Sequence, residues 1–166
     1  MPHLKSLLSP SMKKGLQKAI YAELYQSNLW KHIANQLQRL GYFGGQKYFL
    51  AESAEELTHY QIFVDFINDM GDVADVPKID AIEDDIESLS TALQVAYDME
   101  LDVYNQYKKF YEEAIDEDVT VGIFMQQFVT IQLKAVGSYG DLISRYNRCG
   151  TNEAAILEFD EYLSEQ

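Results

Sequence analysis

Apolar residues recur at intervals of three and four along most of the chain, the spacing of one face of an α-helix. The predicted helices cover residues about 11–40, 45–70, 88–115, 118–148 and 151–163. Ser9 and Ser11, on either side of Pro10, supply a capping signal for the first helix, and Gly41 ends it. The chain shows no alternation typical of strands, so the predicted fold class is all-α, with four long helices and a short fifth one.

Each long helix carries a run of apolar residues expected to face a common core. These are Leu16, Ala19, Ile20 and Leu24 in the first; Phe49, Leu50, Leu57, Phe63, Phe66 and Ile67 in the second; Leu93, Ala96, Tyr97, Leu101, Tyr104 and Tyr107 in the third; and Val121, Phe124, Phe128, Ile131, Leu133, Val136 and Leu142 in the fourth. Gly44 and Gly45 are expected to make the turn that places the first two helices antiparallel.

Residues 71–87 form a long connection with Pro77, many acids and no helical apolar face. About fourteen extended residues span roughly 45 Å, close to the length of a helix of about 27 residues. The segment can therefore return along the whole bundle, which lets the second and third helices run parallel. The sequence predicts one domain over residues 1–166, a four-helix bundle with a long crossover.

Polar residues stand near the middle of each predicted long helix. They are Glu23 in the first, Glu56 and His59 in the second, Glu100 in the third and Gln132 in the fourth. Glu56 and His59 are three positions apart, so both side chains can reach one point beside their helix. Since core residues flank each of these positions, we expect all five side chains to point inward at the same depth.

Carboxylates buried without a cation cost several kcal/mol each, so three of them together must be protonated or neutralised. Two divalent ions would neutralise them. Glu56 would bridge the ions, Glu23 and His59 would complete one and Glu100 the other, while Gln132 would orient a bound water or oxygen species. At this point a second interpretation stays open, in which the helices are rotated so that these side chains never meet.

Composition limits the function further. The 166-residue chain has a formal net charge of −14, which argues against a nucleic-acid partner and favours cations. Its single cysteine, Cys149, excludes an internal disulfide framework and an iron–sulfur centre within the chain. The sequence has no run of about eighteen apolar residues and no apolar leader in its opening stretch, so we expect no membrane partner and a cytoplasmic location.

These motifs resemble the non-haem ferritins, of both bacterial and animal heavy-chain type, along essentially the whole chain. The matching stretches are Ala22-Glu23-Leu24-Tyr25, Lys47-Tyr48-Phe49-Leu50, Glu55-Glu56-x-x-His59, Ala92-Leu93 through Glu100, and Gln132-Leu133-Lys134-Ala135. The resemblance implies a ferroxidase centre that holds two iron ions per subunit and oxidises Fe(II) with oxygen or hydrogen peroxide. Its residues would be Glu23, Glu56, His59, Glu100 and Gln132. It also implies a homo-oligomeric shell, 24 subunits in this family, that stores ferric oxyhydroxide mineral.

The chain also departs from the family pattern. Trp30 replaces the tyrosine beside the centre and is a candidate redox neighbour. Acids that hold a third iron in bacterial ferritins are replaced here, which leaves Glu55 as a candidate for mineral nucleation or iron transit. The replacements are Ile131, Lys134 and Ala135 at the third iron and Gly122 and Met125 at the family's acidic iron channel. Haem-binding relatives carry a second Glu-x-x-His on the fourth helix, where this chain has Gln132 and Ala135, so no haem is expected.

Two other functions remain as alternatives. The first is a related di-iron protein that consumes peroxide without storing iron. The missing second Glu-x-x-His, the absence of a cysteine quartet and the fifth helix argue against it. The second is a catalytically weak assembly module with the same fold, which the complete set of ligands argues against.

Overall fold

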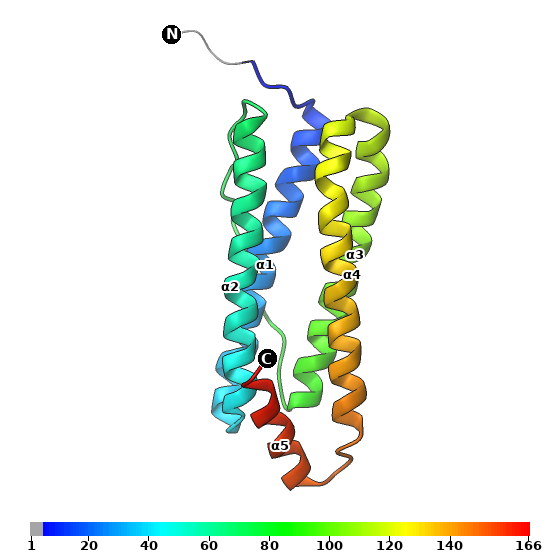
Figure 1. Ribbon diagram of the computed structural model, residues 1–166. Helices are drawn as coiled ribbons and strands as arrows, with labels where there is room; N and C mark the ends of the chain where they lie inside the picture. The colour runs from blue at the N-terminus through cyan, green and yellow to red at the C-terminus, as the bar shows by residue number, and fades with distance from the viewer. Residues whose placement is uncertain (1–4) are drawn as a thin grey trace.

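The computed structural model describes residues 5–166, and that part of the chain contains five helices and no strand. The helices are α1 (Pro10–Leu40), α2 (Phe43–Asp69), α3 (Leu89–Glu117), α4 (Val119–Asn147) and α5 (Glu153–Leu163). The long helices α1 to α4 lie side by side, with α5 across one end (Figure 1). The prediction of an all-α, four-helix bundle with a short fifth helix is confirmed.

The bundle consists of two antiparallel pairs, α1 with α2 and α3 with α4. The segment between Asp69 and Leu89 runs back along the length of the bundle, so that α2 and α3 point the same way (Figure 1). Side chains of α1 hold this crossover in place. Gln17 donates to the carbonyl of Asp75 at 3.0 Å, and the amide of Ile86 donates to Oε1 of Gln36 at 2.8 Å.

α2 begins at Phe43, two residues earlier than expected, and Gly44 and Gly45 lie in its first turn instead of in the connection. Gly41, at φ 88°, makes the turn by itself. The two glycine amides donate to the buried carboxylate of Asp160 in α5, at 3.0 and 2.7 Å. A Cβ on Gly44 would lie 1.7 Å from the carbonyl oxygen of Asp160, so only glycine lets α5 approach this closely.

The interior consists of two apolar halves with a polar layer between them. One half includes Leu16, Ile20, Phe63 and Phe128, and the other includes Trp30, Phe49, Leu93 and Tyr139. The buried polar residues that form the layer are Glu23, Gln26, Ser27, Ser53, Glu56, Glu100 and Gln132. This layer is where the four helices bring their central polar residues together.

Four residues expected in the core lie on the surface instead. Leu50 is 44% exposed, Leu57 40%, Leu101 36% and Leu133 56%. The apolar faces of these helices are wider than a single four-helix bundle can cover, so periodicity alone did not separate the buried rows from the exposed ones.

α4 is long and apolar enough in composition to cross a membrane, although the core helix of a soluble bundle meets the same criterion. Only 28% of its most apolar stretch is buried within this chain. Ile123, for example, is 63% exposed. α4 therefore presents an apolar surface that nothing in this single chain covers.

We expect Asp160→Ala to lower the free energy of unfolding by about 1–3 kcal/mol, because two buried amides lose their acceptor. The measurement is denaturant unfolding followed by circular dichroism. Glu158→Ala, at an exposed position of the same helix, is the matched control and should change stability little. Equal stability of the two variants would contradict this account of how α5 is held.

Candidate metal centre

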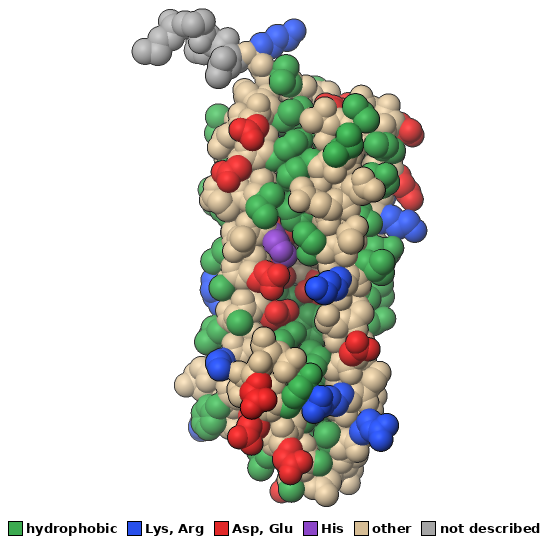
Figure 2. Space-filling view, in the orientation of Figure 1, with side chains coloured by type: hydrophobic (Ala, Val, Ile, Leu, Met, Phe, Trp, Pro, Cys, Tyr) green, Lys and Arg blue, Asp and Glu red, His purple; other side chains and the backbone are tan. Residues whose placement is uncertain are grey.

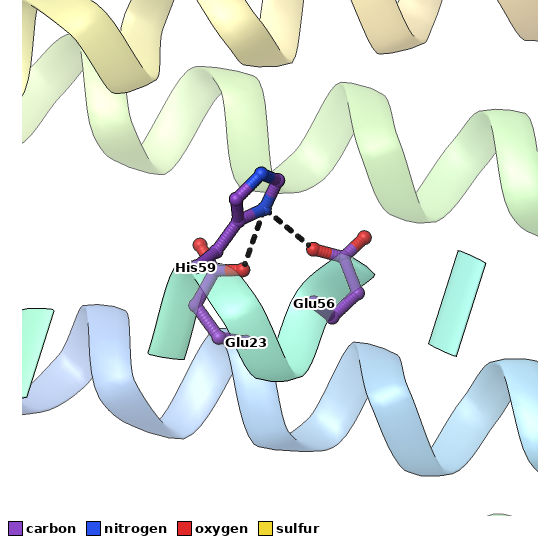
Figure 3. Close-up of side chains that lie close together, drawn as sticks. All are labelled: Glu23, Glu56 and His59. Atoms are coloured by element: carbon purple, nitrogen blue, oxygen red, sulfur yellow. Dashed lines mark hydrogen bonds and ion pairs between the residues drawn. The ribbon is translucent and has the colours of Figure 1, made fainter. Parts of the chain in front are cut away.

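Glu23 of α1 and Glu56 and His59 of α2 meet in the polar layer. One ligand atom from each lies within 4.8 Å of the others. Figure 3 shows the imidazole of His59 pointing toward both carboxylates. Glu23 and Glu56 are 1% and 5% exposed, and the side chain of His59 is 12% exposed. α1 supplies Glu23 from its inward face, and the helical repeat of α2 puts Glu56 and His59 on the face that packs against α1.

The imidazole of His59 faces both carboxylates with the same nitrogen. Its Nδ1 lies 3.0 Å from Oε2 of Glu56 and 3.4 Å from Oε2 of Glu23. A ring nitrogen carries one hydrogen at most, so it cannot satisfy both acceptors. Oε2 of Glu23 is left as a buried oxygen with no hydrogen-bond donor. A cation between the three groups would satisfy this oxygen and accept the Nδ1 lone pair.

Glu100 and Gln132 form the other side of the polar layer. The amide of Gln132 donates to Oε2 of Glu100, and Gln26 donates to the same oxygen at 3.0 Å. Among the described residues, Glu100 does not belong to the compact group of three. Gln132, expected to orient a bound water or oxygen species, donates a hydrogen bond to the Glu100 carboxylate in this structure.

Glu56 acts electrostatically on both sides of the layer. Burial raises the pKa of Glu23 to about 8, and the charge of Glu56 adds to that effect against the hydrogen bond from His59. Burial and then the charge of Glu56 also raise the pKa of Glu100 well above its usual range. The charge of Glu56 therefore acts on both of the other carboxylates.

The pKa of His59 is raised even though the side chain is mostly buried. Burial alone would lower its pKa, but hydrogen bonding to Glu23 and Glu56 outweighs that and raises the pKa to about 10. Without a metal, this cluster therefore holds protons in place of cations at neutral pH.

Two aromatic residues position the carboxylates. The indole of Trp30 donates to Oε1 of Glu56 at 3.1 Å, and the hydroxyl of Tyr107 donates to Oε1 of Glu23. Each of these bonds fixes one oxygen of the carboxylate and leaves the other oxygen turned toward His59. Such outer contacts are what hold metal ligands in a productive orientation.

A cavity of about 330 Å³ connects this group to the surface between α2 and α4. These two helices approach each other less closely than the helices within each pair do. Figure 2 shows a histidine and a group of acidic side chains at mid-height on this face. Glu55 lines the cavity with its side chain 65% exposed, and its Oε1 lies 3.9 Å from Nε2 of His59.

Sequence reasoning missed four residues in and around this centre: Gln26, Glu52, Tyr107 and Tyr139. Helical spacing could have identified three of them. Gln26 follows Glu23 by three positions, Glu52 precedes Glu56 by four, and Tyr107 follows Glu100 by seven. Tyr139, seven positions after Gln132, was one aromatic residue among many and had no partner in the sequence to single it out.

This donor set suits a hard or intermediate cation. Carboxylate oxygens outnumber the single imidazole nitrogen, a combination that serves iron and manganese well. The side chains of Glu23, Glu56 and His59 therefore fit iron as a bound substrate.

The sequence matches the family of ferritin-like domains over residues 13–149. It is 22% identical over 158 residues to a probable bacterial non-heme ferritin-like protein of Haemophilus influenzae, covering 95% of this chain and 96% of that protein. It is also 22% identical to a bacterial non-heme ferritin of Bacteroides fragilis, covering 96% of this chain and 100% of the relative.

Solved structures show the same fold. The open pore ferritin from the archaeon Archaeoglobus fulgidus superimposes with a TM-score of 0.92 at 24% identity, covering 96% of this chain and 99% of the other. A humanized archaeal ferritin gives a TM-score of 0.92 at 26% identity, with 96% and 97% covered.

Binding of Zn(II) to the metal-free protein at pH 7 should release roughly two protons, because His59 and Glu23 must both lose theirs to become ligands. Protons compete with the metal below the raised pKa values, so the affinity should rise as the pH is raised toward 8. Calorimetry in buffers of different ionisation enthalpy measures the release. Glu23→Gln should reduce it to roughly one proton. Release that is the same in both proteins would show that Glu23 is not a ligand.

Proposed function

The chain belongs to the family of ferritin-like domains, and from that premise we propose that it is a non-haem ferritin that oxidises and stores iron. In this proposal Glu23, Glu56, His59, Glu100 and Gln132 form a ferroxidase centre that takes two Fe(II) ions per subunit. Oxygen or hydrogen peroxide is the oxidant. The Fe(III) product is stored as ferric oxyhydroxide inside a hollow homo-oligomer.

The observation that carries the proposal is the unsatisfied oxygen of Glu23. It is buried, lacks a donor and lies 3.4 Å from the same histidine nitrogen that contacts Glu56. A native core rarely leaves a buried polar atom in that condition. A bound cation would remove the cost, and by offsetting the charge of Glu56 it would also relieve the repulsion that helps to raise the pKa of Glu100.

The same residues explain why iron bound here would be oxidised easily. Carboxylate ligands stabilise Fe(III) more than Fe(II), so a centre rich in oxygen donors lowers the energy of oxidation. The side chains of five residues leave open positions around two ions, through which an oxidant can approach and the product can leave. Trp30 and Tyr107 keep Glu56 and Glu23 oriented during this exchange.

The cavity between α2 and α4 supplies a path to and from the centre. It is lined by Glu52, Glu55 and Glu56, so its walls attract cations. Glu55 stands at the exposed end and serves in this proposal as a transit ligand or as a nucleation point for mineral. Lys134 lies in the same wall and adds a positive charge there, which favours transit over a permanent third site.

Exposed apolar side chains support assembly into a shell, for which we propose 24 subunits in the cytoplasm. Ile123 and Leu133 on α4 and Leu57 on α2 are 63%, 56% and 40% exposed. Monomeric soluble proteins seldom expose extended apolar surfaces of this kind. α5 buries Phe159 and Leu163 within its own chain, while Leu157, on its outer face, stays 57% exposed.

Glu56→Ala should lower the initial rate of Fe(II) oxidation by at least ~100-fold, because it removes the ligand shared by both ions. Stopped-flow absorbance after mixing with Fe(II) in air measures the rate. Glu112→Gln, an exposed acid on α3, is the control and should oxidise iron at the normal rate. If Glu56→Ala oxidised iron as fast as the control, the proposed centre would be wrong.

Light scattering coupled to size exclusion should give a mass near 24 times 19.1 kDa, and the particles should retain iron after Fe(II) is added in air. The exposed leucine and isoleucine side chains of α2 and α4 supply the contacts. Leu133→Glu places a charge in this surface and should shift the mass toward smaller species. If the wild-type protein were a monomer, the proposed storage shell would be wrong. The proposed oxidation centre is tested separately, by the Glu56→Ala variant.

A further inference from the structure

Gln26 lies in the polar layer but has no role in the ferroxidase centre proposed above. It follows Glu23 by one turn of α1 and is fully buried. Its Nε2 donates to Oε2 of Glu100, on α3, at 3.0 Å. Its own oxygen, Oε1, is buried and has no hydrogen-bond partner. One half of this amide therefore contacts a proposed iron ligand, and the other half is unpaired.

Only two buried side-chain atoms among residues 5–166 lack a hydrogen-bond partner, and both belong to this layer. They are Oε2 of Glu23, to which the proposed function assigns a cation, and Oε1 of Gln26. An apolar residue of similar size, such as methionine, would fill the position of Gln26 without burying an unpaired polar atom. A glutamine kept at this cost indicates a function for its amide in the centre.

One face of α1 contacts all three carboxylates of the layer. Glu23 is itself one of them, while Gln26 donates to Glu100 and Trp30 donates to Glu56 at 3.1 Å. The three α1 residues are spaced three and four positions apart, so they lie on the same side of the helix. A single rigid helix thus fixes the relative positions of carboxylates that come from three different helices.

Glu100 accepts two hydrogen bonds, and both reach the same oxygen. Gln26 donates from α1 and Gln132 donates from α4, each to Oε2. Neither bond uses Oε1 of Glu100, which stays available to an ion. Two glutamines from different helices therefore share the task of orienting one proposed ligand.

The two glutamines differ in their access to the cavity. Gln132 and Glu100 line the cavity of about 330 Å³ between α2 and α4, whereas Gln26 takes no part in its lining. A water molecule or an oxidant that enters by this cavity reaches Gln132. When Gln132 turns to contact it, as its predicted role requires, Glu100 keeps only the hydrogen bond from Gln26.

We propose that Gln26 is a positioning residue of the ferroxidase centre, which keeps Glu100 in place for the second ion and so frees Gln132 to contact the oxidant. This inference rests on the proposed function, because the second ion belongs to that centre. The unpaired Oε1 of Gln26 accepts a hydrogen bond from a water molecule on the second ion, so the amide is fully satisfied only when that ion is present. Gln26 acts on the reaction through its neighbours.

The test is titration of the assembled, metal-free protein with Co(II) in the absence of air, so that no oxidation accompanies binding. Calorimetry gives the affinity of each ion, and the visible spectrum of Co(II) reports its ligands. Gln26→Met keeps the length of the side chain but removes its donor and acceptor. It should weaken binding of the second ion by about 10- to 100-fold, the usual effect of losing an outer contact to a ligand, and leave the first ion unchanged.

Two further variants make this result specific. Gln132→Met should weaken the second ion much less than Gln26→Met does, because Gln26 still donates to Glu100. Gln36→Met is the matched control and should bind both ions as the wild type does. Gln36 is a half-buried glutamine of the same helix, but its partner is Ile86 in the crossover.

The rate of Fe(II) oxidation as a function of Fe(II) concentration separates positioning from a role in folding. Gln26→Met should raise the concentration that gives half the maximal rate and keep most of that maximal rate, whereas Gln132→Met should lower the maximal rate. The Tm of Gln26→Met should stay close to that of the wild type, because the change removes an unpaired buried atom. A Tm that falls further than that of Gln36→Met would assign Gln26 to folding and overturn the positioning role.

The remaining outcomes distinguish this role from the proposed function. If Gln26→Met binds the second Co(II) ion as tightly as the wild type, or if Gln132→Met loses as much affinity, the positioning role is wrong and the proposed function is unaffected. If the wild type binds two Co(II) ions but oxidises no iron, the proposed function fails and the affinities still decide the role of Gln26. A wild type that binds fewer than two Co(II) ions overturns both the two-ion centre and the role of Gln26.

Discussion

The structure depends on the cost of placing three carboxylates in the middle of an apolar bundle with one imidazole beside them. Glu23, Glu56 and Glu100 are each at most 5% exposed, and His59 is the only cationic group among them. The layer can satisfy this arrangement with protons, as the raised pKa values of Glu23 and Glu100 indicate, or with metal ions. A site that is costly without cations and satisfied with them is well suited to take up iron and pass it on.

The rest of the fold surrounds that layer and leaves it open to the surface between α2 and α4. The apolar halves above and below it exclude water along the bundle axis, and the close pairing of α1 with α2 and of α3 with α4 seals two more directions. Helices α2 and α4 pack less closely, which leaves a cavity between them. This cavity is lined by Glu52 and Glu55 and connects the centre to the surface. Asp160 fixes α5 to the first turn of α2, so the end of the bundle is held by the chain itself.

Much of this could be predicted because long helices with a 3.6-residue repeat leave few choices. The repeat showed which stretches are helical, and the position of each central polar residue indicated that these residues would lie at one depth. The repeat was wrong where the apolar face was wide: Leu57 and Leu133 fit the pattern but lie on the surface. The prediction that Gly44 and Gly45 form the turn was also wrong. Their lack of a side chain makes room for the carboxylate of Asp160, which follows more than a hundred residues later.

The sequence by itself determined the fold class and the order and approximate bounds of the helices. It also determined the inward position of the central polar residues, which are Glu23, Glu56, His59, Glu100 and Gln132. All of these features depend on spacing within one helix or on the reach of one connection. Only the tertiary structure decided which oxygens face His59, that Gln132 holds Glu100, and that Tyr139 of α4 meets Glu52 of α2 beside Trp30 of α1. Those contacts join residues on different helices. They depend on how the helices rotate and pack against one another, which a repeat read along a single helix does not specify.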